Sequence, residues 1–182
     1  MNMKWISLAT VLFSLSTFAA PHPATSTSAT IGQSAGKYFS QHGFKVSLGR
    51  TSWKQVSAPK EYKNIEAVYK GQSESVGVPD PSLTVRRDNL LKKVSLERYV
   101  KRWLKDYHRF GFEILTSKKV KVGANVGYML DLLHPDSAHQ LRQVVFVRKK
   151  NAVIFTCRDS KKTFMKNLKS CNEIVRTFAW TI

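Results

Sequence analysis

The clearest pattern of apolar and polar residues in the chain runs from Ser95 to Phe110 and has the spacing of a helix. Its apolar positions recur at steps of three and four and are Leu96, Tyr99, Val100, Trp103, Leu104, Tyr107 and Phe110. Such steps place the side chains on one face of an α-helix. Ser95 is a suitable N-cap, and Gly111 is a suitable stop after the last turn. The pattern predicts an amphipathic helix whose broad aromatic face packs against a large apolar surface, for which a sheet is the natural partner.

A second amphipathic helix is predicted near the end of the chain, over residues 161–178. Its expected buried face is Phe164, Met165, Leu168, Cys171, Ile174, Val175 and Phe178. Asp159 or Ser160 is expected to cap its first turn, because short polar side chains are preferred there.

The remaining patterns are typical of strands joined by turns. Three strands are expected before the first helix, at residues 44–48, 65–70 and 82–86, with a loop over residues 56–60. Four more follow it, at residues 112–122, 126–133, 141–148 and 152–158. The links between these four are short, so neighbouring strands must run antiparallel. The order predicts an α+β fold in which an antiparallel β-sheet is flanked by helices.

The first residues have the pattern of an export signal. Lys4 precedes an apolar run at residues 5–15, and small residues at 16–20 favour cleavage after Ala19. We therefore expect a signal peptide at residues 1–19, with an uncleaved anchor as the alternative. Residues 20–36 are rich in Ser, Thr, Ala and Pro and predict a flexible linker, or alternatively a docking peptide. Residues 37–182 are long enough for one basic α+β domain with its own core.

Export changes how the two cysteines are interpreted. Cys157 alternates with apolar residues on a predicted strand, and Cys171 lies on the apolar face of the following helix. In a reducing compartment they would be buried thiols, whereas outside the cytoplasm a disulfide is favoured. We expect a Cys157–Cys171 bond that links the last helix to its strand, in a periplasmic or secreted protein.

Several of these features together resemble the PsbP family, which includes the extrinsic proteins of photosystem II and periplasmic DcrB-like proteins. The similar parts are residues 43–48 followed by Trp53, the helix over 96–110, the hairpin meander and the strand that leads into the last helix. The resemblance covers nearly all of the mature domain as a pattern. It implies a PsbP-like α/β/α sandwich that works as a binding or assembly module and not as an enzyme.

Motifs for catalysis are missing from the sequence. It contains no GxSxG, HExxH, P-loop or GxGxxG motif, and no pair of its 12 acidic residues stands out as an acid and base. We therefore expect no enzymatic activity and no cofactor. One local cluster, His134, Asp136 and His139, lies at a predicted hairpin mouth and predicts a possible zinc or copper site. The alternative is a polar hairpin tip in which Pro135 and Asp136 only shape the turn.

Positive charge is the dominant compositional feature. All 12 acidic residues and all but two of the 30 basic residues lie from Gly43 onward, so this part carries a net charge of +16. The first helix concentrates cations opposite its aromatic face, at Arg98, Lys101, Arg102, Lys105 and Arg109. Like charges at these spacings repel one another, and an anionic partner would relieve the repulsion. Plain solubility is the alternative explanation.

These observations lead to one main functional expectation. We expect an exported binding or accessory module of the cell envelope that docks an anionic partner, such as a lipid headgroup or polysaccharide, through its basic helix. An assembly factor that binds a specific envelope protein is the alternative, and the metal site is a second one. Export and the lack of an exposed aromatic run with stacking spacing argue against nucleic acid.

Overall fold

The computed structural model describes residues 36–73 and 76–181, so the predicted signal peptide and nearly all of the predicted linker lie outside the described residues. The described part contains a large sheet of seven strands in the order β3-β4-β5-β9-β8-β7-β6. All neighbouring strands in it are antiparallel. Its strands are β3 (Lys54–Val56), β4 (Ile65–Lys70), β5 (Ser82–Asn89), β6 (Glu113–Val122), β7 (Asn125–Leu133), β8 (His139–Arg148) and β9 (Asn151–Ser160).

A small second sheet has the strand order β1-β2-β10, with β1 at Lys37–Ser40, β2 at Phe44–Ser47 and β10 at Ala179–Trp180. Its first and last strands come from the two ends of the described chain, and both pair with β2 antiparallel. The sequence patterns did not predict β1, β3 or β10. These strands have four, three and two residues, too few for a periodic pattern to be recognised.

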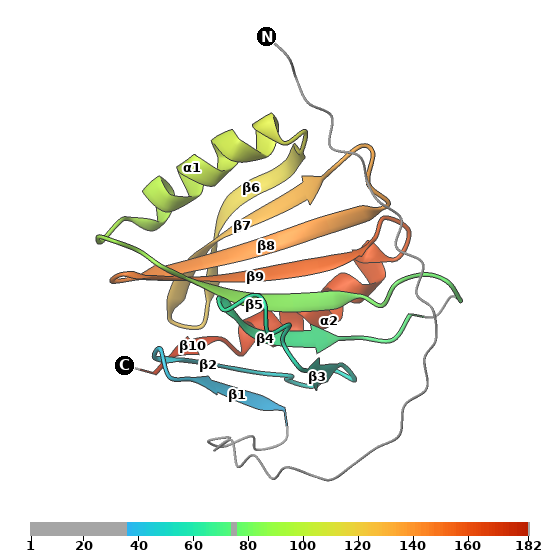
Figure 1. Ribbon diagram of the computed structural model, residues 1–182, viewed down its shortest axis with the longest axis horizontal. Coiled ribbons are helices and arrows are strands. Elements are labelled where there is room, and N and C mark those ends of the chain that lie inside the picture. The colour runs from blue at the N-terminus through green and yellow to red at the C-terminus, as the bar shows by residue number, and fades with distance from the viewer. Residues whose placement is uncertain (1–35, 74–75, 182) are drawn as a thin grey trace, which may run out of the picture. The chain divides into compact units, whose positions relative to one another are not determined.

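The two helices lie on opposite faces of the large sheet (Figure 1). Helix α1 (Leu96–Arg109) covers one face over β6, β7 and β8, around a core that includes Val100, Leu130 and Val145. Helix α2 (Phe164–Arg176) and the small sheet cover the other face, around a core that includes Phe44, Phe146 and Phe155. The predicted fold class is confirmed: antiparallel sheets flanked by helices in an α+β arrangement.

The predicted link between α2 and the sheet is also present. Cys157 on β9 and Cys171 on α2 form a disulfide, with their Cα atoms 6.2 Å apart. Both residues are buried in the core between α2 and the large sheet. No helix among the residues the structure describes is long and apolar enough to cross a membrane.

Three details of the helices differ from the sequence-based expectation. Phe110 is 65% exposed, because it is the C-cap of α1 and lies beyond the last turn that faces the sheet. Met165 is 75% exposed, because it lies beside the buried face of α2 that contains Phe164 and Leu168. The N-cap of α2 is Thr163, whose hydroxyl shares a hydrogen bond of 2.6 Å with the Ser160 hydroxyl and does not cap the helix backbone. Neither Asp159 nor Ser160 caps the helix, because β9 continues through Ser160 and the helix begins later.

Candidate functional site

Helix α1 is held on the large sheet by its apolar edge. Val100 is fully buried, and Tyr99, Trp103 and Tyr107 are half-buried against the same core. The ends of the helix are as the sequence predicts. The Ser95 hydroxyl accepts a hydrogen bond from the Arg98 backbone N–H at 3.2 Å, and Gly111 ends the helix at a φ of +77°. The rotation of the helix about its own axis is therefore defined.

Polar contacts fix this rotation further. The Tyr99 hydroxyl donates to Asp88 Oδ2 at 2.5 Å, and the Tyr107 hydroxyl donates to Gln143 Oε1. Burial raises the pKa of Tyr99, and the Asp88 carboxylate raises it further, so the phenol stays a donor. Arg86 pairs with Asp88, with Nε 3.1 Å from Oδ1, and its guanidinium lies 5.0 Å from the ring centre of Trp103. These contacts leave the opposite face of α1 turned outward.

The outward face of α1 carries the predicted cations. Arg98, Lys101, Arg102, Lys105 and Arg109 are all exposed. Arg109 lies 3.7 Å from Asp106, whereas the other four have no ion pair within the described part of the chain. The other acidic residue of the helix, Glu97, pairs instead with Lys119 of β6 at 2.7 Å. We call these five residues the α1 cationic face.

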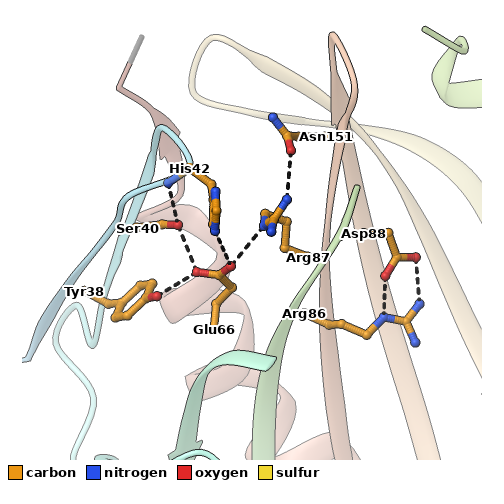
Figure 2. A network of polar contacts seen from close by, with 8 residues as sticks. All are labelled: Tyr38, Ser40, His42, Glu66, Arg86, Arg87, Asp88 and Asn151. Carbon is orange, nitrogen blue, oxygen red and sulfur yellow. Dashed lines mark hydrogen bonds and ion pairs between the residues drawn. The ribbon is translucent and has the colours of Figure 1, made fainter. Parts of the chain in front are cut away.

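Figure 2 shows a second polar network, which joins the small sheet to the large one. Glu66 on β4 accepts hydrogen bonds from Tyr38 at 2.7 Å and Ser40 at 2.9 Å, and its other oxygen lies 3.1 Å from Arg87 Nε. His42 Nε2 lies 3.6 Å from the same carboxylate. The Glu66 side chain at its centre is only 9% exposed, so its carboxylate is satisfied by this network and connects the two sheets.

Two successive residues of β5 each belong to one of these networks, Arg86 to the one at α1 and Arg87 to the one at Glu66. Arg86 points toward α1 and Arg87 toward Glu66, because neighbouring side chains of a strand point to opposite faces. Neither network was expected from the sequence. Tyr38 and Glu66 are 28 residues apart, and no local pattern signals such a contact.

The predicted metal ligands surround one depression of about 620 Å³ at the mouth of the β7–β8 hairpin. His134 packs its ring against Phe112, with ring centres 5.1 Å apart, and His139 Nδ1 lies 3.3 Å from Arg158 Nη2. Burial and the Arg158 charge lower the pKa of His139. Across residues 36–73 and 76–181, no group of three His, Cys, Asp or Glu side chains is placed to hold a metal ion. The site at His134, Asp136 and His139 stays a prediction, and a guanidinium beside His139 opposes a cation there.

A further cluster at the edge of the domain was not recognised in the sequence. The Leu90 backbone N–H donates to the Lys150 carbonyl oxygen at 2.7 Å, which joins the β5–α1 loop to the β8–β9 turn. The loop contributes Lys92 and Lys93, and the turn contributes Lys149 and Lys150. The loop and the turn are far apart in sequence, and they lie at the same edge of the domain because β5 pairs with β9 as far as Asn89 and Asn151.

Comparisons with known proteins address the fold. No family model matches the chain, and no curated protein matches it by sequence. Solved structures do resemble its fold, among them three with TM-scores above 0.5. Cyanobacterial PsbP (CyanoP) from Synechocystis sp. PCC 6803 has a TM-score of 0.56 at 12% identity, covering 86% of this chain and 98% of its own.

LpqN, described as involved in cell envelope biogenesis of Mycobacterium tuberculosis, has a TM-score of 0.63 at 10% identity, covering 77% of this chain and 86% of its own. PA94 of Pseudomonas aeruginosa is described as a protein of unknown function and putative regulator. It has a TM-score of 0.56 at 16% identity, covering 70% of this chain and 96% of its own. Likeness at such low identity concerns the fold and not the activity. The domain adopts the PsbP-like fold, as the pattern of its sequence predicted.

Proposed function

We propose that this protein is an exported, non-enzymatic accessory module of the cell envelope, which docks an anionic partner through the α1 cationic face. One observation carries the proposal. Four exposed cations on one helix face have no carboxylate partner among the described residues, while the opposite face is fixed to the sheet. The like charges of such a surface repel one another, and binding of an anionic partner would remove this repulsion.

Two independent features support an envelope location. The predicted signal peptide directs the chain out of the cytoplasm, and the Cys157–Cys171 disulfide is the state favoured in an oxidising compartment. LpqN, which shares the fold, is described as a protein of envelope biogenesis. That description is consistent with the proposal.

The mechanism is electrostatic docking of a rigid surface. Each Lys or Arg close to an anionic membrane contributes about 1 kcal/mol, and the contribution falls off within a Debye length. Because the aromatic edge of α1 is already fixed to the sheet, the cations are presented without the cost of ordering a flexible segment. The large sheet then serves as the scaffold that orients the cationic face.

The experiment is a binding titration of the mature domain at two salt concentrations. Anionic vesicles, lipopolysaccharide and neutral vesicles are compared. We expect binding to at least one anionic surface that weakens strongly at high salt, with no binding to the neutral vesicles. Binding that is absent, or that is indifferent to salt, would contradict electrostatic docking.

The same surface is compatible with an acidic envelope protein as the partner, which is the assembly-factor alternative. Cross-linked pull-down from an envelope extract tests it. A stoichiometric partner that is lost when the α1 cations are reversed, together with no binding to lipid or lipopolysaccharide, would favour the assembly factor over the anionic surface.

A further inference from the structure

The edge where the β5–α1 loop meets the β8–β9 turn combines exposed cations with an exposed apolar side chain. The Leu90–Lys150 hydrogen bond and the pairing of Asn89 with Asn151 hold the two segments together. We call this the basic edge and define it by Leu91, Lys92, Lys93, Arg98, Arg102, Lys149 and Lys150.

A cavity of about 310 Å³ opens at the basic edge, beside the start of α1. Lys92, Arg98 and Arg102 supply its charged lining, and Leu90, Leu91, Val94 and Tyr99 supply its apolar lining. None of its lining residues is acidic, and none of the three cations forms an ion pair within the residues described here. The cavity is therefore suited to an anionic group attached to an apolar body.

Leu91 is the exposed apolar element of this edge. It is 97% exposed and is followed directly by Lys92 and Lys93. Transfer of an exposed leucine side chain from water into an apolar layer is favourable. The surrounding cations would attract an anionic surface toward it. Apolar side chains next to Lys and Arg are the usual composition of segments that lie in the headgroup region of a bilayer.

We infer that the basic edge binds the surface of an anionic phospholipid bilayer. Lys92, Arg98 and Arg102 contact headgroup phosphates, and Leu91 enters the boundary of the acyl chains. This inference rests on the proposed function and narrows its anionic partner to a lipid. The apolar side chain distinguishes the lipid from a polysaccharide or a free phosphate, since those ligands would use the cations and leave Leu91 in water.

Tryptophan substitution tests the insertion of Leu91. The Leu91→Trp variant is mixed with phosphatidylglycerol vesicles whose acyl chains carry bromine, which quenches a tryptophan that enters the apolar layer. Met165→Trp is the matched control, because Met165 is also exposed, at 75%, but lies on α2 at the opposite face of the large sheet. We expect additional quenching over the wild type for Leu91→Trp and none for Met165→Trp. Equal quenching of the two variants would overturn the inference.

Affinity measurements separate this inference from the proposed function. Leu91→Asp is expected to weaken binding to phosphatidylglycerol vesicles by about tenfold, with Met165→Asp unchanged. Soluble glycerol phosphate should not compete at concentrations that match the vesicle phosphate. Competition at those concentrations would point to a free phosphate and overturn the lipid assignment.

Lipopolysaccharide distinguishes the remaining outcomes. If charge reversal on α1 abolishes lipopolysaccharide binding while the vesicles are not bound, the inference fails and the proposed function stands. If neither surface is bound, both fail. Circular dichroism of each variant confirms that the loop substitutions leave the fold intact.

Discussion

At the scale of single residues, the structure is held by polar contacts between side chains distant in sequence. Glu66 accepts from Tyr38 and Ser40 of the small sheet and pairs with Arg87 of the large one. The caps of α1 could be predicted from sequence, because Ser95 and Gly111 act on neighbouring backbone groups. The Glu66 network could not, because its members meet only after β1 and β4 are placed by the fold.

A half-buried and a fully buried tyrosine allow a comparison of a paired with an unpaired hydroxyl. Tyr69 is fully buried, and its hydroxyl has no hydrogen-bond partner among the described residues, whereas Tyr38 donates to Glu66. Tyr38→Phe is expected to lower the free energy of unfolding by about 1–2 kcal/mol. Tyr69→Phe should leave it unchanged or raise it slightly, because it removes an unpaired polar group. Urea denaturation measures both, and a larger loss for Tyr69→Phe would contradict the account.

The tyrosines also predict how stability depends on alkaline pH. Burial raises the pKa of Tyr107 to about 12, and burial raises the pKa of Tyr69 as well. The folded state thus holds these protons above the ordinary phenol pKa of about 10. The resulting stabilisation is complete below about pH 10 and is lost as the pH rises toward 12. Phenolate absorbance of Tyr107 and Tyr69, isolated by Phe substitutions, should appear only above that range or with unfolding, and ionisation near pH 10 in the folded protein would contradict it.

At the scale of elements, long periodic segments were predicted well and short ones were missed. The helices and the four meander strands have enough residues to show a period. Strand β10 has two residues and exists because Ala179 and Trp180 pair with Lys45 and Phe44. The start of α2 was wrong for a related reason. Tertiary pairing extends β9 through Ser160, and Asp159 accepts from Asn167 of the helix instead of capping it.

The disulfide between α2 and β9 gives a prediction at this scale. Its cysteines are 14 residues apart, and closing such a loop stabilises a domain by about 3 kcal/mol in the chain-entropy model. Replacing Cys157 and Cys171 together with Ala is expected to lower the free energy of unfolding by about that amount. A reductant should destabilise the wild type in urea and leave the double variant unaffected. A wild type whose urea midpoint does not respond to reductant would contradict the role assigned to the bond.

At the scale of the whole described domain, the large sheet separates two helices with different surroundings. Helix α2 shares its core with the small sheet and is tied to β9 by the disulfide. Helix α1, on the other side of the large sheet (Figure 1), carries five exposed cations on its outer face. The spacing of the α1 cations in the sequence was enough to predict that they share one face of the helix. It did not predict the basic edge, because the pairing of β5 with β9 is a non-consecutive contact that brings the β5–α1 loop to the β8–β9 turn.

If the α1 cationic face, and not the net charge, docks the anionic partner, charge reversal on α1 must lower the affinity more than the same reversal elsewhere. A matched pair of double charge reversals separates the two explanations: Arg102→Glu with Lys105→Glu on α1, and Lys162→Glu just before α2 with Lys169→Glu on it. Both variants change the net charge equally and alter only exposed side chains. Affinity for whichever anionic surface binds the wild type, lipopolysaccharide or anionic vesicles, is measured at low salt. We expect a loss of affinity of about tenfold or more for the α1 variant and a much smaller loss for the α2 variant. Equal losses for the two variants would contradict it.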